Sequence, residues 1–124
     1  MLTNDAPIIP ISWPRGYSLP LPVSVIDPDG NPYVLQPGEK LRFAVVRVSG
    51  GKPLIQKELT SADYKDGVYP LRIMPEDTAQ LSLDTYHYDV AWQSADGKDY
   101  IQIVGWSEFK LTPNGSNLEV GAVG

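Results

Sequence analysis

Residues 86–93 read Tyr-His-Tyr-Asp-Val-Ala-Trp-Gln, and their strict alternation decides the fold class. Large apolar or aromatic side chains occupy every second position, and polar or small side chains occupy the positions between them. Successive side chains of a strand point to opposite faces of a sheet, so the pattern predicts a strand with one buried face. The inward set is Tyr86, Tyr88, Val90 and Trp92, and the outward set is His87, Asp89, Ala91 and Gln93.

Similar strand patterns recur along the chain, separated by turns rich in Gly, Pro, Asp and Asn. They cover residues 17–25, 39–49, 53–59, 68–74 and 100–111. Residues 75–81 predict a short turn or a single helical turn that crosses from one sheet to the other. These elements together predict an all-β fold, an immunoglobulin-like β-sandwich of about seven to eight antiparallel strands, with a small barrel as the alternative.

Three positions add detail to the predicted sandwich. Tyr86 is the candidate for a tyrosine corner, whose hydroxyl ties a strand start back to the preceding turn. Gly105 lies inside the last strand and predicts a β-bulge. Pro20 and Pro22 have no N–H and share one side of their strand, so that side is expected to be a free sheet edge.

The domain organisation follows from the limits of these strands. Residues 1–13 are expected to form an N-terminal extended arm, residues 14–111 the sandwich, and residues 112–124 a flexible C-terminal tail. The segment from Pro7 to Trp13 is apolar and interrupted by prolines, which indicates either an extended arm or an edge strand.

Composition excludes several classes of function. The 124 residues carry a formal net charge of −5, and the ten Lys and Arg residues are dispersed, so nucleic acid is not an expected partner. The start of the chain has no signal-peptide pattern, and no apolar stretch approaches the ~20 residues that a membrane span requires. The chain has no cysteine, which leaves neither a disulfide nor a cysteine-bound zinc as an expectation.

No constellation of residues predicts catalysis, and we expect no catalytic, cofactor-binding or metal-binding residues. His87 is the single histidine and falls on an outward strand position; a hydrolase built around it is a third hypothesis. Asp27, Asp29 and Asn31 resemble the opening of a calcium loop, but a turn held by Asp side chains explains the same spacing. The Asn-Gly-Ser at 114–116 has the spacing of a glycosylation acceptor and is interpreted as part of the tail.

Apolar and aromatic residues that no strand pattern buries are the candidates for contacts with other molecules. The interface candidates are Ile8, Ile9, Ile11, Trp13 and Trp106. An apolar arm must be buried on its own sheet or on a neighbouring chain, and we expect the arm to order on a neighbour. An exposed tryptophan can instead stack on a sugar ring, so a carbohydrate-binding sandwich is the alternative.

The turn-and-strand pattern also resembles a family of tailed-phage proteins. The resemblance rests on 14–19 (PRGYSL), 25–35 (VIDPDGNPYVL), 41–43 (LRF), 66–69 (DGVY), Thr78 with Leu81, 86–90 (YHYDV), 96–98 (DGK), and Gly105 before 109–111 (FKL). In these segments the chain is similar to the immunoglobulin-like N-terminal domain of upper baseplate and tail-fibre adaptor proteins of phages and prophages.

This resemblance implies a non-enzymatic structural protein of a phage virion, in the tail, the baseplate or a fibre attachment. Head decoration or a neck protein is the alternative within the particle. The implied partners are other virion proteins and further copies of the chain in a symmetric assembly, and the implied location is the virion.

Overall fold

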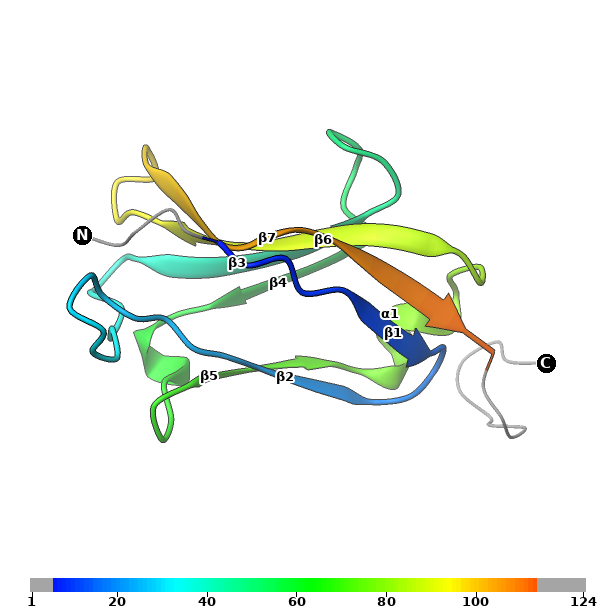
Figure 1. Cartoon of the computed structure of the whole chain (residues 1–124), viewed down its shortest axis with the longest axis horizontal. Helices are drawn as coiled ribbons and strands as arrows, with labels where there is room; N and C mark the ends of the chain where they lie inside the picture. Colours follow the sequence, from blue (N-terminus) through cyan, green and yellow to red (C-terminus); the bar gives the residue numbers. More distant parts are fainter. Residues whose placement is uncertain (1–5, 114–124) are drawn as a thin grey trace.

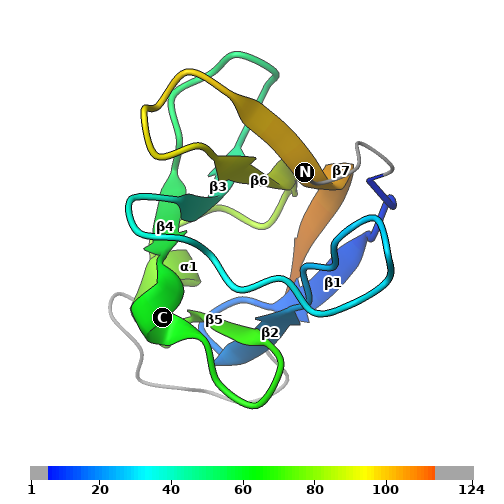
Figure 2. The same cartoon turned by 90° about the vertical axis from the view of Figure 1, so that its left-hand side faces the viewer.

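Two β-sheets lie face to face (Figures 1 and 2). The buried apolar side chains that form the core come from strands of both sheets. The computed structural model describes residues 6–113. One sheet has five strands in the order β1-β7-β6-β3-β4, and the other pairs β2 with β5. The strands are β1 (Ile11–Pro14), β2 (Leu19–Val23), β3 (Lys40–Val46), β4 (Ile55–Leu59), β5 (Tyr69–Ile73), β6 (Thr85–Gln93) and β7 (Tyr100–Thr112); short helices are η1 (Ser61–Asp63) and α1 (Pro75–Ala79).

The strands form an all-β sandwich, as their alternating patterns predict. Helix α1 carries the chain across from β5 in the small sheet to β6 in the large one, where β6 pairs with β3 and β7. One expectation is wrong: the strands are not all antiparallel, because β1 pairs in parallel with β7. Strands β1 and β7 lie at opposite ends of the described chain and are not joined by a tight turn. The connection therefore does not require them to run in opposite directions.

The core is built from alternate positions of the strands in both sheets. Phe43, Tyr69, Tyr86 and Phe109 are its largest side chains and are almost completely buried. The buried hydroxyl of Tyr69 donates to the carbonyl oxygen of Tyr33 (3.0 Å) and accepts from the amide of Leu35 (2.7 Å). Buried polar groups need such partners, so these two bonds fix the loop before β3 on the core.

The predicted tyrosine corner is present at the start of β6. The Tyr86 hydroxyl donates to the carbonyl oxygen of Ser82 at 2.8 Å, while the side chain as a whole is buried. Arg47 lies 5.0 Å from the centre of the Tyr86 ring and forms an ion pair with Asp84 at 2.7 Å. The corner therefore fixes the turn that follows α1 against the large sheet.

The predicted bulge at Gly105 is also present. Tyr88 of β6 pairs with Ser107, whereas Val90 pairs with Val104, so β7 uses three steps where β6 uses two. A second register shift, between Val90 and Ala91, restores the inward parity of the odd-numbered residues, so the change is confined to the region of Val104 and Gly105. Val104 and Ser107 are both buried, and Trp106 between them points outward.

Prolines lie along one free edge of each sheet, at β1 in the large sheet and at β2 in the small one. Strand β2 pairs only with β5, which confirms the edge predicted from Pro20 and Pro22. On β1, the amide of Arg15 donates to the Thr112 carbonyl oxygen at 3.0 Å, so the odd-numbered residues face β7. Pro10 and Pro14 therefore lie on the free side of the β1 segment. Missing N–H groups at an edge oppose pairing with a further strand.

Candidate functional site

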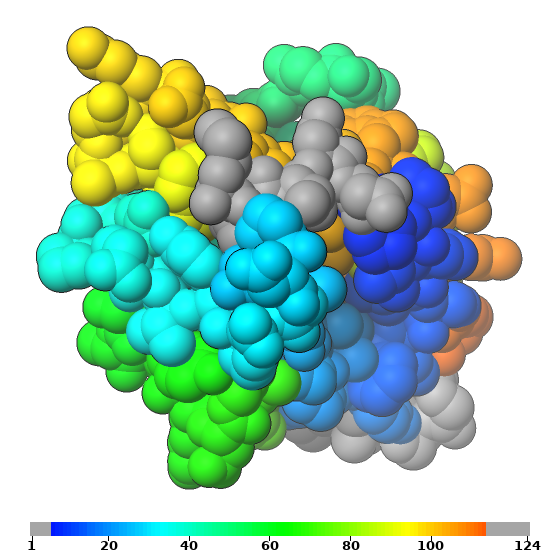
Figure 3. All heavy atoms as spheres, turned by 60° about the vertical axis from the view of Figure 1, so that its left-hand side comes forward, coloured from blue at the N-terminus to red at the C-terminus, as the bar shows by residue number. Residues whose placement is uncertain are grey.

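The apolar segment before β1 lies against this chain's own sheet (Figure 3). The Pro7 carbonyl oxygen accepts from the Gly105 amide at 2.7 Å, and the Ile9 amide donates to the Ser107 hydroxyl at 2.9 Å. The Tyr88 hydroxyl donates to the Ile9 carbonyl oxygen. The expectation of an arm that orders on a neighbour is therefore wrong for these residues, and the alternative of an edge strand is the correct one.

The predicted domain limits change accordingly. The boundary at residue 13 falls inside β1 (Ile11–Pro14), and the last strand extends to Thr112, one residue beyond the predicted end of the sandwich. The described residues before β1 are thus part of the sandwich. Residues 1–5 of the predicted arm and 114–124 of the predicted tail, including the Asn-Gly-Ser at 114–116, lie outside the described residues.

The five interface candidates separate according to the direction of their side chains. Ile11 and Trp13 are half-buried and pack against the core of this chain, because they share the inward parity of β1. The indole N–H of Trp13 is buried and makes no hydrogen bond. Ile9 lines a cleft between the sheets and keeps 45% of its surface exposed. Ile8 and Trp106 are directed to the outer face.

Ile8 lies next to Gly105, the neighbour of Trp106 in β7. The Gly105 amide donates to the Pro7 carbonyl oxygen at 2.7 Å, and a Cβ atom on Gly105 would come within 2.7 Å of the Ile8 side chain. Ile8 is 64% exposed and Trp106 40% exposed, and the Trp106 ring stacks in parallel on the His87 ring at 5.1 Å. We call Ile8, His87 and Trp106 the outer patch. It is a half-exposed apolar and aromatic surface carried by hydrogen-bonded strands.

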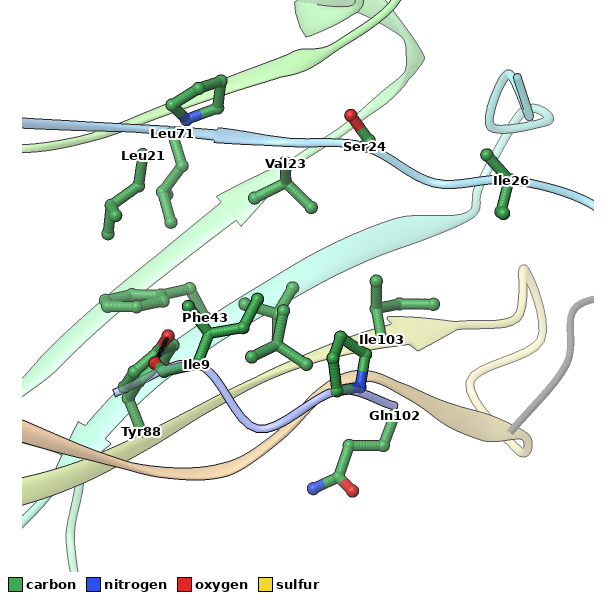
Figure 4. Close-up of a pocket in the computed structure, with 14 residues that line it drawn as sticks. Ile9, Leu21, Val23, Ser24, Ile26, Phe43, Leu71, Tyr88, Gln102 and Ile103 are labelled. Carbon is green, nitrogen blue, oxygen red and sulfur yellow. Dashed lines mark hydrogen bonds between the residues drawn. The ribbon is translucent and has the colours of Figure 1, made fainter. Parts of the chain in front are cut away.

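The second feature is a cleft of about 480 Å³ that opens between β2 and the segment Pro7–Ile9 (Figure 4). Side chains from the two sheets face one another across it, among them Leu21, Val23 and Leu71 on one side and Ile9, Phe43 and Ile103 on the other. Its polar groups are few. The Tyr88 hydroxyl donates a hydrogen bond to the Ile9 carbonyl oxygen, and burial raises the pKa of Tyr88. The chemistry of the cleft is therefore that of an apolar binding surface.

Sequence reasoning missed Ser107, which organises the region between the patch and the cleft. Its hydroxyl is buried, accepts from the Ile9 amide and donates to the Gly105 carbonyl oxygen at 2.7 Å. The signal was a serine at the same strand parity as Phe109 and Leu111, which are both buried. Simple alternation from these two residues therefore indicates its inward direction.

The other chemical candidates occupy structural positions. The Asp27 carboxylate accepts from the amides of Asp29 (3.0 Å) and Asn31 (2.9 Å), which is a side-chain-stabilised turn. His87 lies on the outward face, as predicted, where it stacks on Trp106. Within residues 6–113, no group of three or more His, Asp or Glu side chains is placed to hold a metal ion.

Comparison with family models, with curated proteins and with solved structures finds no match for this chain. No helix in the described part of the chain is long and apolar enough to cross a membrane.

Proposed function

We propose that the protein is a non-enzymatic structural component of a bacteriophage virion that acts by binding other virion proteins. The segments between residues 14 and 111 that resemble baseplate and fibre-adaptor domains support a place in the tail, the baseplate or a fibre attachment. Head decoration or a neck position is the alternative within the particle. The sandwich would be the rigid support, and contacts to neighbours, including further copies, would use its surface.

The outer patch is the observation that carries this proposal. Ile8 and Trp106 expose apolar surface close to Gly105, where the backbone of the segment before β1 is hydrogen-bonded to β7 and needs little further ordering on binding. Tryptophan is among the residues that most often dominate the energy of protein interfaces. Prolines on the β1 segment oppose strand addition at the edge nearest the patch, so the contact there would be made by side chains of the face.

A complementation experiment tests the role of the outer patch. A phage deleted for this gene is supplied with the wild-type chain, with Trp106→Asp, or with the matched control Tyr100→Asp. Tyr100 is a suitable control because it is also on β7 and 56% exposed but lies outside the patch. We expect Trp106→Asp to lower the yield of infectious particles at least tenfold and Tyr100→Asp to leave it near wild type. Equal yields from all three chains would contradict the proposal.

The outward face also favours a second candidate, a carbohydrate-binding module. Trp106 offers a half-exposed ring, and Asp89 and Gln102 lie on the same face, joined by a hydrogen bond of 3.1 Å. Sugars bind proteins through such a combination of ring stacking and polar groups. This candidate predicts glycan-array binding that is lost in Trp106→Ala, and an array without binding would remove its support.

A further inference from the structure

The cleft reaches from the free edge of β2 into the core of the sandwich. Val23, Phe43 and Val90 form part of its walls and are at most 8% exposed. Ile9 and Ile26 also line it and keep 45% and 56% of their surface open to solvent, so they lie at its mouth. Its volume of about 480 Å³ is within the range of natural small-molecule sites, roughly 300–1,000 Å³. The cleft is therefore a cavity with a buried floor and an open mouth.

The polar groups around the cleft leave its interior apolar. The Tyr88 hydroxyl donates to the Ile9 carbonyl oxygen, and the Gln102 amide group donates to Asp89 on the outer face at 3.1 Å. The side chains of Ser24 and Gln102 point away from the cavity (Figure 4). None of the described residues that line the cleft carries a charge. An occupant therefore meets hydrocarbon and finds no polar group inside that lacks a partner.

The backbone at the two rims of the cleft offers few hydrogen bonds to a peptide. Pro20 and Pro22 have no N–H on the free edge of β2. On the opposite rim, the Pro7 carbonyl oxygen and both backbone polar groups of Ile9 are already hydrogen-bonded within the chain. A peptide that entered the cleft would bury amide groups without partners, which is unfavourable. This disfavours a strand from another protein or from a second copy as the occupant.

The cleft is elongated along β2 and the residues that follow it. Leu21 and Ile26 both line it, and at ~3.3 Å per residue the segment between them spans up to ~17 Å. Aliphatic side chains make up most of both walls, with Leu71 facing Ile103 from the opposite sheet (Figure 4). An unbranched hydrocarbon chain matches this elongated shape and needs no hydrogen bonds along its length.

We propose that the cleft binds the unbranched aliphatic chain of a single small ligand with an uncharged headgroup, such as a fatty alcohol. The chain lies between the two sheets, and the headgroup remains in solvent at the mouth. An anionic headgroup is disfavoured, because no basic residue lines the cleft and Asp27 follows Ile26 directly in the chain. This inference does not depend on the proposed role in a virion.

Titration of the full chain with decanol, followed by methyl NMR, tests the site. We expect saturable chemical-shift changes at the methyl groups of Leu21, Leu71 and Ile103, half-complete below the solubility limit of decanol in water. Ile55 and Leu111 are the controls, because they are buried in the same core but do not line the cleft. The absence of saturable changes at the cleft methyls, or equal changes at the controls, would overturn the inference.

Decanoate tests the uncharged headgroup, since it has the same number of carbon atoms as decanol and a negative charge at neutral pH. We expect its dissociation constant, measured at the same methyl groups, to be at least fivefold higher than that of decanol. Equal or tighter binding of decanoate would contradict the assignment of the headgroup.

Two neighbouring isoleucines provide a matched pair of variants. The Ile9 side chain lines the cleft, whereas Ile8 does not, and both are exposed enough to accept a charge. We expect Ile9→Asp to weaken decanol binding at least tenfold, because its carboxylate must be desolvated when the chain enters. Ile8→Asp should leave the affinity within about twofold of wild type, since its charge stays outside. Equal losses in the two variants would overturn the inference.

A cavity-filling variant tests the same site without adding a charge. Leu21→Trp places a larger apolar side chain in the cleft from the side of β2, and Leu59→Trp adds the same bulk on β4, outside the cleft. We expect only Leu21→Trp to abolish the saturable shifts caused by decanol. The methyl signals of Ile55 and Leu111 report that the sandwich remains folded in both variants. Undiminished binding in folded Leu21→Trp would overturn the inference.

Discussion

At the scale of single residues, Tyr86 illustrates what a sequence pattern can locate. The tyrosine follows a turn and begins an alternating strand, and its hydroxyl donates to the Ser82 carbonyl oxygen as predicted. Trp106 has the parity opposite Phe109 and Leu111, which predicts an outward direction unless the bulge at Gly105 changes the register, and the structure leaves it outward. The stack of Trp106 on His87 could not be predicted, since the two residues belong to different strands whose register is set by the whole sheet.

Tyr86→Phe leaves the ring in place and removes the hydroxyl, with its part-buried hydrogen bond to the Ser82 carbonyl oxygen and its weaker contacts with the Ser82 hydroxyl and the Arg47 guanidinium. We expect it to lower the free energy of unfolding by about 1–2 kcal/mol, because the Ser82 carbonyl loses its partner. Urea denaturation followed by tryptophan fluorescence measures the change. Tyr100→Phe is the control, and its exposed position predicts a change within about 0.5 kcal/mol. A loss in Tyr86→Phe no larger than the control's would contradict the assigned role.

Tyr33 predicts a dependence of stability on alkaline pH. Burial, together with its hydrogen bond to the Glu39 carboxylate, raises the pKa of Tyr33 from 10.0 to about 12. The folded chain therefore keeps a proton that the unfolded chain releases first. The stabilisation is complete below pH 10 and is lost as the pH rises from 10 to about 12.

Denaturation midpoints measured between pH 9 and pH 12 test this prediction. Burial also raises the pKa values of Tyr69 and Tyr88, so the wild type is expected to lose stability across this range. Tyr33→Phe removes one of the contributing groups and should give a shallower decline. A variant with the same slope as the wild type would show that Tyr33 does not contribute.

At the scale of elements, periodicity was sufficient for β3, β5 and β6 but not for β1. Three isoleucines within four positions gave the segment before β1 no clear inward parity. Its partner is β7 at the other end of the chain, and a parallel pairing of that kind leaves no local signal. An arm and an edge strand were therefore equally compatible with the sequence until the structure placed the segment on the large sheet.

Ser107→Ala tests how the segment before β1 is attached. The Ile9 amide would lose its acceptor, while the hydrogen bond from the Gly105 amide to the Pro7 carbonyl oxygen would remain. We expect a loss of about 1 kcal/mol in stability and faster amide exchange at Ile9 than elsewhere in the large sheet. Ser12→Ala, on the exposed part of β1, is the control. Unchanged exchange at Ile9 would contradict this account of the attachment.

At the scale of the whole molecule, the alternating strands and their turns were enough to predict a sandwich with a crossover before β6. The outer patch could not be predicted in the same way. Its isoleucine and its tryptophan come from opposite ends of the chain, and the attachment of the segment before β1 to Gly105 brings them close. The cleft likewise follows from the absence of a strand beside β2 within the described residues, which no single segment encodes.

The proposed role as a structural component of a virion is tested most directly by the protein content of purified particles. The proposal requires that a phage or prophage encodes the chain; virions of that phage are separated by density from free protein and quantified by mass spectrometry against the major capsid and tail proteins. We predict that the chain remains with the particles in a fixed ratio to one tail, baseplate or other structural protein. A chain found only in the soluble fraction, in a lysate that contains intact infectious particles, would contradict its role as a structural component.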